Sequence, residues 1–160
     1  MVYKPKTKTA TFSELEMADS QFMNKTLSVL NTINATVSWD TIEDRLIQHY
    51  PVGKKKAGSP AYPPLVLFKA LLLKQWFAIK SDTDLQSQIN DRLSFKRFLG
   101  FSITDSSPAS ITFARFRSRL TREVLTGVTT DLTDQLSGNG LSITLGSAAD
   151  PRLGAFLPIH

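Results

Sequence analysis

The sequence predicts a mostly α-helical protein, with a helical bundle, a helix-turn-helix-like segment and one strand near the C-terminus. Apolar residues recur at helical spacing over most of residues 20–137. The stretch 64–79 is apolar on nearly every side, as expected of a central helix. Only residues 141–145, L-S-I-T-L, alternate between apolar and polar side chains as a strand does.

The first two helices are predicted over about residues 20–34 and from Asp40 to just before Pro51. Asp40 is followed three residues later by Glu43, which is the spacing of a capping box. Residues 51–64 contain glycines, prolines and three lysines, and they predict an exposed basic loop.

The third helix is predicted to begin at Pro64, a favourable first-turn residue, and to run to about Ile79. Lys69 and Lys74 interrupt it, and it is too short to span a bilayer. Trp76 and Phe77 continue its apolar surface. They are therefore interpreted as core residues rather than as a platform for a ligand.

Three shorter signals place the next helices. Ser81 with Asp84 predicts a capped helix start. Gly100 suits a left-handed residue after a helix over 94–99. Ser107 before Pro108 predicts the start of a further helix.

That further helix is predicted to carry two faces. On a wheel of 100° per residue the apolar side chains Phe113, Phe116, Leu120 and Val124 fall on one side, and Thr112, Arg115, Arg119 and Arg122 fall on another. The helical pattern continues to about residue 136 and ends at Gly138-Asn139-Gly140. A buried stripe thus backs three outward guanidinium groups.

Composition excludes several classes of function. The chain has 160 residues and no cysteine, so disulfides and thiolate metal sites are ruled out. Its two histidines, His49 and His160, make a histidine-rich metal site improbable. No signal peptide or membrane span is recognisable, and a cytoplasmic location without membrane contact is expected.

The net charge of +5 is unevenly distributed. Residues 51–122 contain thirteen basic and four acidic residues, a net charge of +9, whereas residues 1–50 and 123–160 carry −1 and −3. A cationic middle can attract a polyanion such as DNA, or it can be a solvated surface. Only Asp105 offers a carboxylate between residues 92 and 122, which favours DNA.

Arginine suits phosphate because its planar fork donates two parallel hydrogen bonds. Residues 81–122 can be read as helix, turn and helix with the arginine helix second, although the connection is longer than the usual turn. The candidate DNA-contacting residues are Thr112, Arg115, Arg119, Arg122, Arg117, Arg92, Lys96, Arg97, Lys54, Lys55 and Lys56.

Three segments resemble the N-terminal region of bacterial insertion-sequence transposases of the DDE type, in the insertion-sequence-five group. They are Y-P-P-L-V-L-F-K-A-L-L-L-K-Q-W-F at 62–77, D-R-L-S-F-K-R-F-L-G-F at 91–101 and I-T-F-A-R-F-R-S-R-L at 111–120. The resemblance implies an extension at 1–37, a helical DNA-binding domain at 38–137 and a remnant of a ribonuclease-H-like catalytic domain at 138–160.

For the whole family, the resemblance implies three carboxylates that hold two divalent metals, with Mg²⁺ as the expected ion. Asp150 matches the first carboxylate, and so it would also be the metal ligand of an intact catalytic domain. Pro151 follows it, and the second aspartate and the glutamate have no counterpart. The chain alone is therefore expected to use no cofactor and to lack strand-transfer activity.

Three functional hypotheses follow. The first is a truncated transposase that binds the terminal inverted repeats of an insertion sequence as double-stranded DNA. The second is a stand-alone DNA-binding inhibitor of transposition or a helix-turn-helix regulator, acting with a second copy of the chain or with an intact transposase. The third is a remnant without function.

Overall fold

The protein is described here by a computed structural model that covers residues 25–50, 61–143 and 156–158. These residues form a mostly helical fold, as the sequence predicts. The predicted basic loop with Lys54, Lys55 and Lys56, and the predicted catalytic remnant with Asp150, lie outside the described residues.

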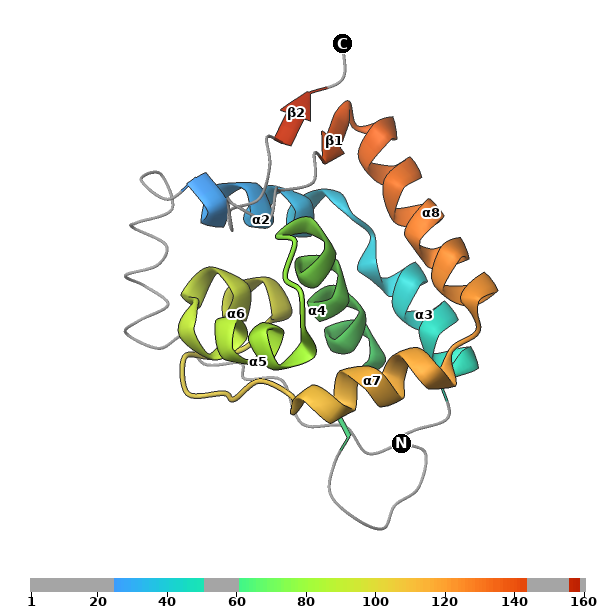
Figure 1. Cartoon of the computed structure of the whole chain (residues 1–160). Helices are drawn as coiled ribbons and strands as arrows, with labels where there is room; N and C mark the ends of the chain where they lie inside the picture. Colours follow the sequence, from blue (N-terminus) through green and yellow to red (C-terminus); the bar gives the residue numbers. More distant parts are fainter. Residues whose placement is uncertain (1–24, 51–60, 144–155, 159–160) are drawn as a thin grey trace.

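Helix α4 (Pro64–Trp76) is the centre of the fold (Figure 1). Ten of its thirteen residues are buried, because α3 (Trp39–His49), α5 (Asp82–Asp91), α6 (Leu93–Leu99) and α7 (Ser110–Arg119) all pack against it. Trp76 and Phe77 are buried in this core, and the prediction that they are core residues is confirmed.

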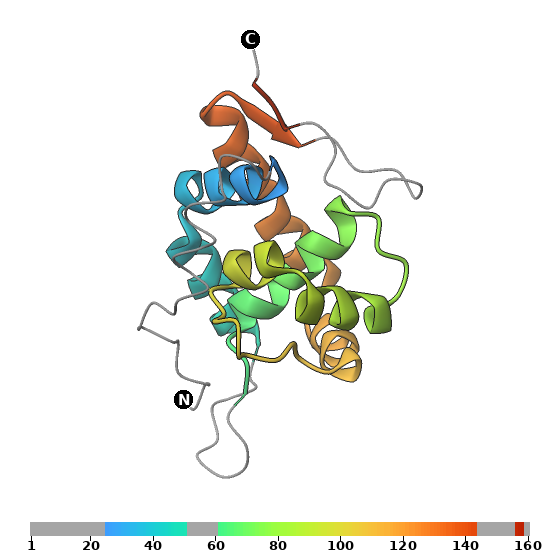
Figure 2. The same cartoon turned by 90° about the vertical axis from the view of Figure 1, so that its left-hand side faces the viewer.

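Two further helices complete the bundle. Helix α2 (Lys25–Thr36) packs on α6, and α8 (Arg122–Gly138) packs along α3. At the end of α8, strand β1 (Leu141–Ile143) pairs antiparallel with β2 (Phe156–Pro158), so that Leu141 lies opposite Pro158 (Figure 2). The predicted strand at 141–145 is thus present at 141–143.

Two predicted helix ends are confirmed. The Ser81 side chain accepts a hydrogen bond of 3.0 Å from the backbone N–H of Asp84 and caps α5. Gly100 follows α6 with a φ of 77°, the left-handed conformation that glycine adopts without a steric penalty.

Two predicted helix caps are wrong, although α3 begins within one residue of its predicted start. Asp40 lies inside the first turn of α3, and the residue before the helix is Ser38, whose side chain forms no cap. Ser107 does not cap α7, because its hydroxyl donates to the Pro108 carbonyl at 2.8 Å. Helix α7 begins at Ser110, after Ala109, which has no side-chain oxygen to accept a capping bond.

The single long helix predicted beyond residue 108 is also wrong. The chain becomes extended at Leu120 and Thr121, with ψ values of 141° and 154°, and this break separates α7 from α8. Thr121 then caps α8, since its hydroxyl accepts from the backbone N–H of Val124 at 3.3 Å. Leu120 is buried at this corner, whereas Val124 is only half-buried.

Within the described ranges, no helix is both long and apolar enough to cross a membrane.

Candidate nucleic-acid interface

The exposed face of α7 carries the strongest candidate surface. Phe113 and Phe116 are fully buried on one side of this helix, while Arg115 and Arg119 are exposed on the other. Arg122 is the first residue of α8 and is exposed as well. We call Arg115, Arg119 and Arg122 the arginine ridge.

The ridge therefore extends over two helices. The helical break at Leu120 and Thr121 means that the spacing of Arg122 from Arg119 is not that of one continuous helix. The three arginines nevertheless follow one another along the α7–α8 corner, which Figure 1 shows at the edge of the molecule. Thr112 is half-buried one turn before the ridge.

Carboxylates of the described residues leave the charge of the ridge unpaired. Among the described residues, no arginine of the ridge forms an ion pair with a carboxylate. Arg119 lies instead beside the hydroxyl of Tyr50. Burial raises the pKa of Tyr50, and the charge of Arg119 and its hydrogen bond act against that rise. Arg119 is thus held beside a phenol rather than a carboxylate.

Arg117 lies on the same helix but is engaged differently. Its guanidinium donates two hydrogen bonds to Asp82, at 2.8 Å and 2.5 Å, and Lys74 donates to the same carboxylate at 2.9 Å. The hydrogen bond from Arg117 is the main reason why the pKa of Asp82 falls to about 2. Arg117 therefore joins α7 to the start of α5.

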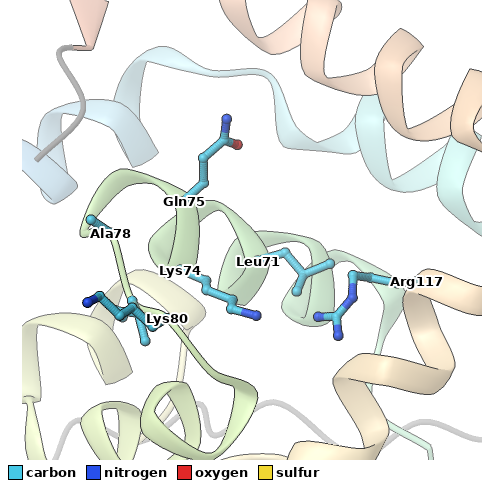
Figure 3. Close-up of a pocket in the computed structure, with 7 residues that line it drawn as sticks. Leu71, Lys74, Gln75, Ala78, Lys80 and Arg117 are labelled. Carbon is cyan, nitrogen blue, oxygen red and sulfur yellow. The ribbon is translucent and has the colours of Figure 1, made fainter. Parts of the chain in front are cut away.

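A cleft of about 530 Å³ lies beside this network (Figure 3). Apolar side chains of Leu71, Ala78 and Ile79 line it together with the cations Lys74, Lys80 and Arg117. Two of its three cations already donate to Asp82, so the cleft is less suited to an anion than its lining suggests.

Helix α6 directs its cations inward. Lys96 is buried, with 7% of its surface exposed, and its ammonium donates to the carbonyls of Ile103 and Asp105, both at 2.8 Å. The side chain thereby holds the loop that leads into α7. Lys96 is therefore poorly placed for the phosphate contact that the sequence suggested.

The two other basic residues near α6 are also engaged. Arg92 packs its guanidinium against the rings of Phe77 and Phe95, at 4.8 Å and 4.2 Å from their centroids, and burial lowers its pKa. Arg97 is half-buried and donates to Asn31 at 3.3 Å. Both side chains therefore have partners within the fold, and neither needs a DNA contact to explain its position.

Helix α7 is positioned by polar side chains that sequence reasoning missed. Gln86 of α5 accepts from the backbone N–H of Ser110 at 3.0 Å, and Asn90 accepts from that of Ser107 at 2.8 Å. The bond to Ser110 pairs one of the donors at the uncapped start of α7. Gln86 and Asn90 both lie outside the buried face of α5, and nothing else in the sequence indicates that they bond to the chain around the start of α7.

The connection between α5 and α7 is not a short turn. It contains α6 and the loop of residues 100–109. Residues near the end of α5 bond to the start of α7, while Asp82 at the start of α5 bonds to Arg117 near the end of α7. The two helices thus contact each other, and they are joined by α6 and a loop rather than by the short turn of a helix-turn-helix.

No metal site is found in the described part of the chain. Within residues 25–50, 61–143 and 156–158, no three histidine, aspartate or glutamate side chains gather as ligands would. These residues therefore do not fit the paired Mg²⁺ ions that the resemblance implies for intact transposases.

The fold and surface define a helical domain that presents a short basic helix. Residues 17–119 match the family model described as Transposase domain (DUF772), which covers more than half of the 160 residues. The chain therefore belongs to this transposase-domain family. No curated protein sequence and no solved structure matches it.

Proposed function

We propose that the chain binds the terminal inverted repeats of an insertion sequence through the arginine ridge, as the DNA-end-binding part of a DDE transposase of the insertion-sequence-five group. The observation that carries the proposal is a row of exposed guanidinium groups, unpaired with carboxylates of the described residues, in a transposase domain. Arginine forks donate to phosphate oxygens and to guanine edges.

Charge supports this choice of partner. The net +9 of residues 51–122 includes cations that the fold uses internally, namely Lys69, Lys74, Arg92, Lys96 and Arg117. The ridge remains after these are set aside. A surface of this kind attracts DNA through release of counterions, which makes affinity fall steeply with salt.

The ridge is tested by DNA binding of the purified full chain. Affinity is measured by fluorescence anisotropy for a duplex carrying the repeats that flank the gene and for a shuffled duplex of equal composition. Arg115→Gln should reduce the slope of log affinity against log salt by about 0.9, and the triple variant of Arg115, Arg119 and Arg122 by about 2.7.

Lys80→Gln is the matched control, because it removes one exposed positive charge outside the ridge. Its slope should change less than that of Arg115→Gln. If the triple variant and the wild-type protein share one affinity and one slope, the ridge does not face DNA.

For the chain alone we propose end binding without strand transfer. Incubation with the repeat duplex and Mg²⁺ or Mn²⁺ should give no cut or joined DNA. Cleavage or joining would overturn this part of the proposal and leave the binding part intact.

A regulatory role is the second candidate. A protein that occupies element ends without joining them competes with an intact transposase for the same DNA. Addition of the chain to a transposition assay of the intact enzyme should then lower the number of joined products, and the triple arginine variant should not.

A further inference from the structure

One exposed apolar residue begins the same face of α7 that carries the arginines. Ile111 has 54% of its surface exposed, compared with 39% for Leu93 and 37% for Ile103. It lies in the first turn of α7, one residue after Ser110. A single exposed isoleucine is common on protein surfaces, so exposure alone does not indicate a contact with a partner. The position of Ile111 relative to the arginines is more informative.

Helix geometry places Ile111 in line with the ridge. Residues four apart are neighbours on one face of an α-helix, so Ile111, Arg115 and Arg119 form one row along α7. Phe113 and Phe116 lie on the buried side of the helix. The row thus starts with a branched aliphatic side chain and continues with two guanidinium groups.

The first turn of α7 is held in place by α5. The backbone N–H groups of Ser107 and Ser110 donate to the side chains of Asn90 and Gln86. The bond to Ser110 satisfies one of the donors that a helix start leaves free, and the bond to Ser107 holds the chain just before the helix. Ile111 is therefore presented by a fixed helix start.

In a duplex, the C5-methyl group of thymine is the apolar feature of the major groove that side chains recognise. Phosphates, by contrast, offer an aliphatic side chain nothing to pack against. Recognition helices of DNA-binding proteins place their N-terminal residues against base edges. An apolar residue at the start of the row suits a base contact, and the arginines that follow it suit phosphate contacts.

We propose that Ile111 is a specificity-determining residue that contacts a thymine C5-methyl group in the major groove, beside Arg115. This inference rests on the proposed DNA binding by the ridge. Arg115, together with Arg119 and Arg122 farther along the row and around the corner, would then contact the phosphate backbone.

The test removes the two partners of the contact separately. The probe is the duplex most enriched by the full chain from a pool with twenty randomised base pairs. Each thymine is replaced in turn by deoxyuridine, which lacks the methyl group and keeps the base-pairing edge. With wild-type protein, at least one replacement should weaken binding about three- to tenfold, as expected for loss of one buried methyl group.

Ile111→Ala should remove this discrimination, so that it binds the thymine and deoxyuridine duplexes equally. Leu93→Ala is the matched control, since it truncates another exposed aliphatic side chain, and it should keep the discrimination. An unchanged urea midpoint for Ile111→Ala shows that its fold is intact.

The outcomes separate the two proposals. If Arg115→Gln weakens binding but every deoxyuridine duplex binds like its parent, the Ile111 inference is overturned and the ridge proposal survives. If the discrimination persists in Ile111→Ala, another residue reads the methyl group and the inference fails. If neither Arg115→Gln nor the triple arginine variant alters DNA binding, both proposals fail.

Discussion

Helices α6 and α7 are both short and both rich in basic residues, but they use their cations in opposite ways. In α6, Lys96 is buried and donates to two loop carbonyls, and Arg97 bonds to α2. In α7, Arg115 and Arg119 are exposed and pair with no carboxylate of the described residues. The positive charge of a segment therefore says little about which cations are available to a partner.

The comparison makes a double prediction. Removal of an engaged cation should lower stability and leave the salt dependence of DNA binding unchanged. Removal of Arg115 from the ridge should leave stability nearly unchanged and reduce the salt dependence of DNA binding. Lys96→Met removes an engaged cation directly, and substitutions of Asp82, the partner of Arg117 and Lys74, and of Gly127, beneath Arg45, test two further sites of engaged cations.

The largest effect is expected at Lys96. Lys96→Met keeps the side-chain length but leaves the carbonyls of Ile103 and Asp105 without their donor. We expect a loss of about 2–3 kcal/mol in the free energy of unfolding, because hydrogen bonds from charged groups are worth about 1.5–3 kcal/mol. Urea unfolding followed by circular dichroism measures it.

Arg115→Gln is the counterpart, with an expected stability change within about 0.5 kcal/mol, as for an exposed substitution. Equal stabilities of Lys96→Met and Arg115→Gln would contradict the distinction between the two helices.

Much of this fold could be predicted from the sequence, because the signals involved are local. Pro64 starts α4, Ser81 caps α5 and Gly100 ends α6, each through contacts within a few residues. The break at Leu120 was also locally encoded, since Thr121 is a good cap and Glu123 follows in the first turn of α8. The continuous apolar spacing across residues 113–124 hid that signal.

The candidate site could be predicted only in part. Helical spacing separated Arg115 and Arg119 from Phe113 and Phe116, and the structure places them on opposite sides as expected. The sequence could not separate these arginines from Lys96, because the carbonyls that Lys96 meets belong to a loop seven to nine residues away. Tertiary contacts of this kind decide which cations remain available to a partner.

An intermediate loss of stability is expected for the network of Asp82, Arg117 and Lys74. Asp82→Asn removes the charge that joins α5 to α4 and α7, and we expect a loss of about 1–2 kcal/mol, since the bidentate pair is stronger than an ordinary surface ion pair. The pKa of Asp82 is lowered to about 2 from an ordinary 3.8. Its contribution is therefore fully present above about pH 4 and is lost as the pH falls through 2.

Urea unfolding between about pH 2 and pH 6 tests this prediction. The stability difference between wild type and Asp82→Asn should be constant above about pH 4 and shrink below it. A difference that grows on acidification would show that the network does not act as described. DNA binding of Asp82→Asn should retain the wild-type salt slope.

The smallest effect concerns Arg45, which is engaged although 43% of its side chain is exposed. Arg45 forms an ion pair with Asp131 of α8, and its guanidinium passes over Gly127. A Cβ atom at Gly127 would lie 2.6 Å from an Nη atom of Arg45. Glycine in this helix interior therefore leaves room for the ion pair at a cost of about 1 kcal/mol relative to alanine.

Gly127→Ala sets these two effects against each other. Alanine should gain about 1 kcal/mol of helix propensity, and displacement of the flexible Arg45 end should forfeit at most about 1 kcal/mol from an exposed ion pair. We expect a net stabilisation of a few tenths of a kcal/mol in wild type. In the Arg45→Ala background, the same substitution should give the full gain of about 1 kcal/mol. Equal gains in both backgrounds would mean that Gly127 does not accommodate Arg45. The exposed ion pair between Arg45 and Asp131 would then not make Arg45 an engaged cation, and Arg45 would count among the cations available to DNA.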